Sequence, residues 1–171
     1  MKRTLTICCV AFLIPLAQSR PAAQASPAAQ ASPARATDAT RVLEQYKAVW
    51  ADGKQELVDA VFAPNVVRHQ PSSVRPPEVS GREAYRAYIK EFRSLHPDLR
   101  VDVHDVISDG RNIVYRYTAS AFIDPSKAKK FTFTGITIAK LDADGKIAEE
   151  WLTWDTYDLM SQVGLVQPRQ P

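Results

Sequence analysis

The sequence predicts an α+β domain in which helices gather on one face of a curved antiparallel sheet. Apolar residues first recur at helical spacing, as far as Pro97, and then alternate with polar residues at a period of two. The pairs Asp109-Gly110 and Asp144-Gly145 separate the alternating segments, as they do in β-hairpins. Helices followed by consecutive antiparallel strands are typical of this fold class.

The first 37 residues are predicted to precede this domain. Lys2 and Arg3, followed by an apolar run over residues 5–16, have the layout of a secretory signal peptide that ends at residue 19. Residues 20–37 contain a repeated Pro-Ala-Ala-Gln-Ala-Ser unit whose apolar residues are only Ala and Pro, so they are expected to form a disordered spacer. We therefore expect an exported protein, secreted or periplasmic, with one folded domain over residues 38–167.

Cysteine content and charge exclude several functions. Both cysteines, Cys8 and Cys9, leave with the signal peptide, so the mature chain has no disulfide, thiol nucleophile or thiolate metal site. Cleavage also removes Lys2 and Arg3, which takes the net charge from +3 to +1. A charge this close to zero argues against nucleic acid or an anionic membrane as the main partner.

Three helices are expected. The first begins with Asp38 as its cap, buries an apolar stripe that includes Tyr46 and Trp50, and ends at Gly53. A shorter second helix carries apolar residues over 57–62. The third opens at Ser80-Gly81-Arg82-Glu83, which fits a capping box, and ends at Pro97. Its apolar face contains Tyr85, Tyr88, Ile89, Phe92 and Leu95.

Strands are expected over residues 66–69, 99–104, 113–118 and 131–139, with a last one near residue 151. The side of the core opposite the helices should come from inward residues of these strands, namely Val101, Val103, Ile113, Ile136 and Ile138. Gly135 lies in mid-strand, where a bend or bulge is expected.

The most informative stretch is Trp151-Leu152-Thr153-Trp154-Asp155. On a strand, Trp151, Thr153 and Asp155 share one face. A carboxylate at the end of a face that carries an indole is expected to be desolvated, which would raise its pKa toward useful base strength. The alternative is that Asp155 caps the turn or helix that follows.

Several segments in order resemble the SnoaL-like polyketide cyclases, often labelled ester cyclases. They are His96-Pro97-Asp98-Leu99, Phe133-Thr134-Gly135-Ile136, Asp144-Gly145-Lys146-Ile147, Glu150-Trp151 with Asp155, and Gln162-Val163-Gly164-Leu165. The resemblance covers residues 40–165 and implies the cone shared with nuclear transport factor two and steroid isomerase, in which a bent antiparallel sheet packs on helices and encloses an apolar pocket. It also implies that Asp155 is the acid/base of an intramolecular aldol closure, and that the protein is a homodimer.

Other side chains are candidates for the pocket. His69 lies at its expected lip, where it could hydrogen-bond a substrate carbonyl, pair with an acid, or be a loop-edge histidine. Tyr115 could donate to a developing oxyanion or only pack in the core. With Tyr88, Trp151 and Thr153 it completes the expected substrate-binding set. His96 is expected to have a structural role, because a cation is favourable at the C-terminal end of the third helix.

Neither metal nor cofactor is expected. The motif Asp102-x-His104-Asp105 places Asp105 on the opposite strand face from the other two, which disfavours a shared metal ion. The leading hypothesis is a pocket in which Asp155 acts on a small, largely apolar carbonyl compound. The alternatives are a non-catalytic module that binds a hydrophobic ligand or a partner, and an isomerase, dehydratase or epoxide hydrolase that uses the same Asp.

Overall fold

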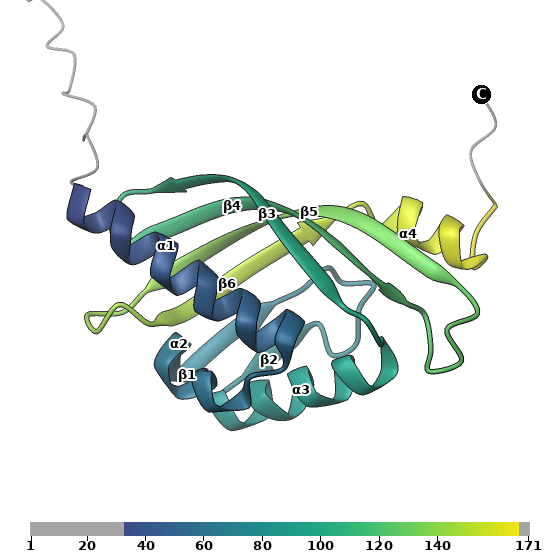
Figure 1. Cartoon of the computed structure of the whole chain (residues 1–171), viewed down its shortest axis with the longest axis horizontal. Coiled ribbons are helices and arrows are strands. Elements are labelled where there is room, and N and C mark those ends of the chain that lie inside the picture. Colours follow the sequence, from purple (N-terminus) through teal and green to yellow (C-terminus); the bar gives the residue numbers. More distant parts are fainter. Residues whose placement is uncertain (1–32, 168–171) are drawn as a thin grey trace, which may run out of the picture.

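The computed structural model describes residues 33–167 and confirms the α+β class (Figure 1). In chain order the elements are α1 (Pro33–Lys47), the π-helical turn η1 (Ala48–Asp52), the 3-10 turn η2 (Gln55–Leu57), α2 (Val58–Val61), β1 (Phe62–His69), β2 (Glu78–Ser80), α3 (Arg82–Leu95), β3 (Arg100–Ser108), β4 (Asn112–Phe122), β5 (Lys130–Leu141), β6 (Ile147–Trp154) and α4 (Thr156–Val163).

The six strands form one curved, open sheet in the order β2-β1-β6-β5-β4-β3. Neighbouring strands run antiparallel except β1 and β6, which are parallel. In Figure 1, α1 lies along the sheet, α3 packs beside β1 and β2, and α4 follows β6 and contacts β5. This arrangement is a cone whose wide end is framed by helices.

The helix boundaries differ from the predicted ones in physically simple ways. The first helix begins at Pro33, five residues before Asp38, so residues 33–37 belong to α1 rather than to the spacer. Proline suits the first helical position and alanine is the strongest helix former. Helix α3 begins after Gly81 with no side-chain cap, because Ser80 pairs in β2 instead, so the predicted capping box is wrong.

The second predicted helix is only one turn long. The expected stripe over 57–62 is divided between η2, α2 and the start of β1, since Phe62 already has extended backbone. Gly53 ends the first helical segment as predicted, with a positive φ of 75°.

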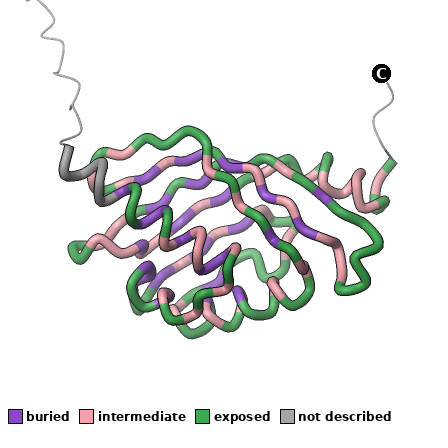
Figure 2. The backbone as a smooth tube through the Cα atoms, viewed as in Figure 1, coloured by how far each residue is buried: buried purple, intermediate pink, exposed green. Residues whose placement is uncertain are grey.

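One core fills the space between sheet and helices, and buried and exposed positions alternate along the strands in Figure 2. Tyr46, Trp50, Tyr85 and Ile113 are buried in it as predicted. Others of the predicted set, Tyr88, Phe92, Val101 and Val103, pack against it while partly exposed.

The predicted inward face of β5 is wrong. Ile136 and Ile138 are 46% and 43% exposed, and their neighbours Thr137 and Ala139 are buried instead. Both faces of β5 carry apolar or small residues, so hydrophobicity alone does not determine which face turns inward.

Gly135 does not form the expected bend or bulge; its lack of a Cβ leaves space for the side chain of Tyr117. The pairing of β4 with β5 continues through Tyr117 and Gly135 without a register shift. A Cβ at Gly135 would lie 2.5 Å from the phenol oxygen of Tyr117 and 2.8 Å from the carbonyl oxygen of Thr153. Any larger residue would therefore displace Tyr117.

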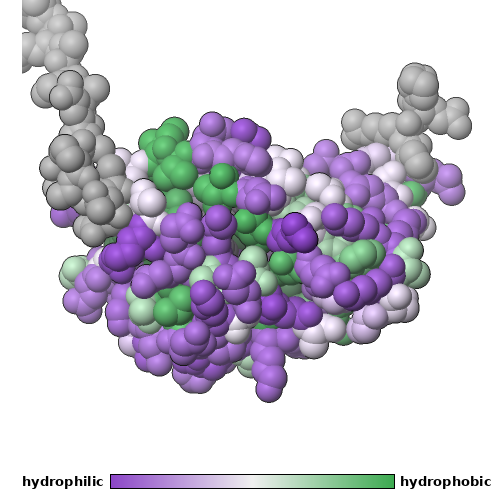
Figure 3. Space-filling view, in the orientation of Figure 1, coloured by the Kyte–Doolittle hydropathy of each residue, from purple (hydrophilic) through white to green (hydrophobic). Residues whose placement is uncertain are grey.

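Residues 33–167 contain no helix that is both long and apolar enough to span a bilayer. The face seen in Figure 3 is mostly hydrophilic, with a small group of hydrophobic side chains near its upper edge. The predicted signal peptide and the spacer up to residue 32 lie outside the described residues.

Candidate functional site: an apolar cavity with a buried arginine

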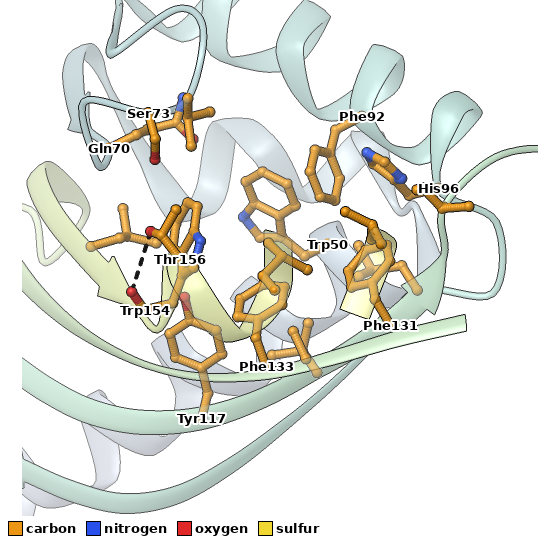
Figure 4. Close-up of a pocket in the computed structure, with 18 of the residues that line it drawn as sticks. Trp50, Gln70, Ser73, Phe92, His96, Tyr117, Phe131, Phe133, Trp154 and Thr156 are labelled. Atoms are coloured by element: carbon orange, nitrogen blue, oxygen red, sulfur yellow. Dashed lines mark hydrogen bonds between the residues drawn. The ribbon is translucent and has the colours of Figure 1, made fainter. Parts of the chain in front are cut away.

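A cavity of about 350 Å³ lies between the inner face of the sheet, α3 and α4. Its wall is mainly aromatic and aliphatic, and Figure 4 shows several of the rings around the same space. The main apolar contributors are Trp50, Phe92, Phe131, Phe133, Leu152, Trp154, Leu159, Met160 and Val163. The volume suits a small organic molecule.

One end of the cavity is polar and is organised by Arg68. This side chain is only 6% exposed and lines the cavity. Its Nη1 donates to Oε1 of Glu150 at 2.5 Å and to the hydroxyls of Tyr85 at 3.1 Å and Tyr46 at 3.3 Å. Its Nε donates to Oε1 of Gln70 at 3.3 Å. Three acceptors therefore share the two N–H groups of Nη1, and a fourth accepts from Nε.

The remaining nitrogen of the guanidinium is Nη2. Nη2 of Arg68 donates to none of the described residues, although the carbon at the centre of the group lies 4.7 Å from the centroid of the Trp50 ring. A guanidinium presents five N–H donors in a fixed plane, so the Nη2 edge is available to a molecule in the cavity.

The partner of Arg68 is Glu150, on the inner face of β6. Glu150 is fully buried, and its Oε1 accepts hydrogen bonds from both Arg68 and Tyr85. Its Oε2 has no partner in the described part of the chain. Because a buried charge without a counter-charge is very costly, each member of this ion pair makes the other tolerable.

The surrounding phenols stay protonated at neutral pH. Burial raises the pKa of Tyr46 to about 12, and the nearby carboxylate of Glu150 adds to the rise. Burial also raises the pKa values of Tyr85, Tyr115 and Tyr117 well above their usual range. These groups therefore act at this end as neutral hydroxyls rather than as bases.

Asp155 does not lie in the cavity, so its predicted burial is wrong. It is exposed, and it is the N-cap of α4, where its Oδ1 accepts a hydrogen bond from the backbone N–H of Asp158 at 2.8 Å. This is the alternative that the sequence left open. The desolvation on which its expected base strength rested is not found.

The expected face of β6 is also inverted. Trp151 and Thr153 lie on the outer face, whereas Glu150, Leu152 and Trp154 point inward. The indole of Trp151 stacks on the ring of His69 with centroids 5.0 Å apart and lies 4.4 Å from Nζ of Lys140. Neither Trp151 nor Thr153 lines the cavity.

His69 pairs with acids, as one of its predicted alternatives required. Its Nε2 lies 3.0 Å from Oε1 of Glu149 and its Nδ1 lies 3.4 Å from Oε2 of Glu78. It does not line the cavity, so the expected contact with a substrate carbonyl is not available from its observed position.

Tyr115 and Tyr88 do lie in the cavity wall, where the sequence placed them. Tyr88 donates to Oε1 of Gln70 at 2.8 Å, which joins it to the group around Arg68. Sequence reasoning missed Arg68, Glu150 and a role for His96 in the wall. Val66 and Arg68 share the buried face of β1, but Val67 on the other face is just as apolar as Val66, so the sequence does not indicate which face turns inward.

Among residues 33–167, no three His, Cys, Asp or Glu side chains are grouped so that they could hold a metal ion.

Comparisons with known proteins agree with this fold. The family model of the SnoaL-like polyketide cyclases matches residues 40–163, and the chain belongs to this family. A Bacillus cereus protein assigned as a polyketide cyclase is 27% identical with a TM-score of 0.65, over 79% of this chain and 86% of that one. No curated protein sequence matches the chain.

Two further solved structures share the fold. A protein from a Jannaschia species, assigned as a SnoaL-like polyketide cyclase, is 21% identical with a TM-score of 0.67, over 82% of this chain and 99% of that one. An epoxide hydrolase from M. tuberculosis is 19% identical with a TM-score of 0.62, over 74% of this chain and 84% of that one. Different activities thus occur on this cone.

Proposed function

We propose that this protein binds a small, mostly apolar, uncharged molecule whose carbonyl oxygen accepts a hydrogen bond from Nη2 of Arg68. The observation that carries the proposal is a buried arginine that lines an otherwise apolar cavity and whose Nη2 donates to none of the described residues. A donor held in place in a dry site binds an acceptor without a large reorganisation cost.

The ligand is expected to be neutral because the charge of Arg68 is already balanced by Glu150. A carboxylate in the same place would add a negative charge with no counter-charge, next to Oε2 of Glu150, which has no partner among the described residues. A ketone, ester or lactone oxygen needs only one donor.

The first test fills the cavity. Ala119 is buried and lines the cavity, whereas Ser120, next along β4, belongs to the other strand face. With acetonaphthone as the probe in a fluorescence titration, Ala119→Leu should weaken binding at least about tenfold by occupying the space. Ser120→Leu should bind as the wild type does. Equal binding by both variants would show that the probe binds elsewhere.

The second test removes the donor without leaving a buried charge. The double variant Arg68→Met with Glu150→Met replaces the ion pair by apolar side chains of similar length, a change that folded proteins often tolerate. Acetonaphthone should lose about tenfold in affinity, whereas ethylnaphthalene, which lacks the carbonyl, should bind no worse. An equal loss for both probes would contradict a role for the carbonyl.

A cyclase-type reaction on the bound molecule is the second candidate, and the family match favours it. In such a reaction Arg68 would stabilise the oxygen of an enolate. We place binding first because Asp155, the acid/base implied by the family resemblance, caps α4 on the outside. Export of the mature chain and its assembly as a homodimer remain predictions.

A further inference from the structure

We infer that His96 is the hydrogen-bond acceptor at the other end of the cavity, and that the ligand therefore carries a hydroxyl or enol O–H opposite its carbonyl. This inference rests on the proposed function, since it concerns the molecule that the cavity binds. It adds a second polar contact, of opposite kind to the first.

His96 lies directly after α3 and lines the cavity. In Figure 4 it is on the opposite side of the cavity from Gln70, which is bonded to Arg68, and the ring of Trp50 lies between them. The two polar ends are thus separated by an aromatic wall, as a ligand with two separated oxygens requires.

The hydrogen bond at Nδ1 determines which nitrogen of the ring is free. Nδ1 of His96 lies 3.2 Å from the carbonyl oxygen of Phe122. A carbonyl only accepts, so Nδ1 carries the proton, and in the neutral ring Nε2 is then an acceptor. No described residue forms a hydrogen bond with Nε2 of His96.

The ring is also held in place. The backbone N–H of Phe122 donates to the carbonyl of Pro97 at 3.0 Å, so the turn after α3 and the end of β4 bond to each other in both directions. The imidazole packs against the rings of Phe92, at 4.6 Å between centroids, and Phe131, at 5.5 Å. Rotating the ring would break these contacts, so the acceptor is preorganised.

The ligand class follows from the two ends. Nη2 of Arg68 can only donate and Nε2 of neutral His96 can only accept, while the wall between them is mainly apolar. A hydroxy ketone with an apolar body satisfies both groups. A methyl ether in place of the hydroxyl has no O–H to donate, so it would not form the hydrogen bond to Nε2.

The experiment compares three probes of one shape: acetonaphthone, its hydroxy derivative and its methoxy derivative, each substituted on the ring that lacks the acetyl group. The test variant is His96→Asn, whose amide N–H can still donate to Phe122 while nothing replaces Nε2. The matched control is His104→Asn, because His104 is exposed and bonds Thr118 rather than the cavity.

The wild type and His104→Asn should bind the hydroxy probe about tenfold more tightly than the methoxy probe. His96→Asn should bind the two within about twofold while its melting temperature stays close to that of the wild type. Absence of the preference in the wild type, or its survival in His96→Asn, would overturn the inference and leave the proposed function standing. If no probe binds the wild type, both fail.

Nitrogen NMR of the wild type provides a second measurement that does not depend on a variant. The His96 ring should show protonated Nδ1 and unprotonated Nε2, and addition of the hydroxy probe should shift the Nε2 resonance. The opposite tautomer, or no shift at saturation, would contradict the inference even if His96→Asn fails to fold.

Discussion

The carboxylate of Asp155 satisfies a backbone donor in the first turn of α4. The first N–H groups of a helix have no partner within it, and Asp is among the residues that best supply one. Its charge also interacts favourably with the positive end of the helix dipole. These contacts account for a carboxylate at this position without any chemistry in the cavity.

At the scale of this residue, Asp155→Ala should lower the free energy of unfolding by about 1 kcal/mol, because it removes the cap. Asp155→Asn should cost only a few tenths of a kcal/mol, since Asn caps almost as well and loses only the charge. Urea denaturation of both variants measures the difference. Probe binding should be unchanged in Asp155→Asn; a large loss would show that the carboxylate acts beyond the cap.

At the scale of elements, the error in the predicted core of β5 and the error in the predicted site on β6 are linked by strand pairing. Ile138 pairs with Trp151 and Ile136 pairs with Thr153 across β5 and β6, and cross-strand partners share a face. The faces predicted to point inward on β5 and β6 therefore lie on the same side of the sheet, and both point outward in the structure. A buried Glu150 looks implausible from sequence because its counter-charge, Arg68, lies 82 positions away.

Helix α4 forms one wall of the cavity although none of its residues is fully buried. Gln162 joins it to β5: its side chain accepts from the N–H of Thr132 at 2.9 Å and donates to the carbonyl of Thr132 at 2.7 Å. The Gln-x-Gly segment noted in the sequence thus contains a side-chain amide that bonds both the N–H and the carbonyl of a strand residue, as a neighbouring strand would.

Gln162→Ala should loosen α4 from the sheet. Hydrogen exchange of the α4 amides should speed up about tenfold, because two hydrogen bonds that oppose local opening are lost, while exchange in the centre of β4 stays unchanged. The control is Gln45→Ala on α1, where the side chain accepts a hydrogen bond from the exposed Arg41. Unchanged exchange in α4 would mean that its apolar contacts alone hold it.

At the scale of the whole molecule, the buried tyrosines predict alkaline sensitivity. Of the 6 tyrosines, Tyr46, Tyr85, Tyr115 and Tyr117 have pKa values raised by burial, Tyr46 to about 12. Above about pH 10 the unfolded chain loses these phenol protons while the folded protein keeps them. The folded state then binds more protons, so stability should be intact below pH 10 and decline above it.

Urea midpoints measured from pH 8 to pH 12 test this decline, with the ultraviolet signal of phenolate as a second readout. Tyr46→Phe should reduce the slope above pH 10, because one of the responsible groups is gone. Tyr157→Phe, at an exposed site, is the control. A flat stability profile up to pH 12 would contradict the assigned burial of the phenols.

The sequence was sufficient for the fold class because the signals for it are local. Helical spacing before Pro97, period-two segments after it, and Asp-Gly turns each report on neighbours in the chain. The site was predictable in part. Tyr88 and Tyr115 could be placed in it because they lie on apolar faces that periodicity reveals. The contact of Arg68 with Glu150 joins β1 to β6, a parallel pairing that no local pattern announces.

That parallel pairing also affects the order in which parts of the protein fold. Strands β4, β5 and β6 each pair with the strand made just before them. β1 can pair early with β2, but its other neighbour, β6, is the last strand of the chain. Closing so long a loop is slow compared with forming a hairpin. Until β6 forms, Arg68 lacks the carboxylate of Glu150, so we expect the cavity to be the last part of the protein to form.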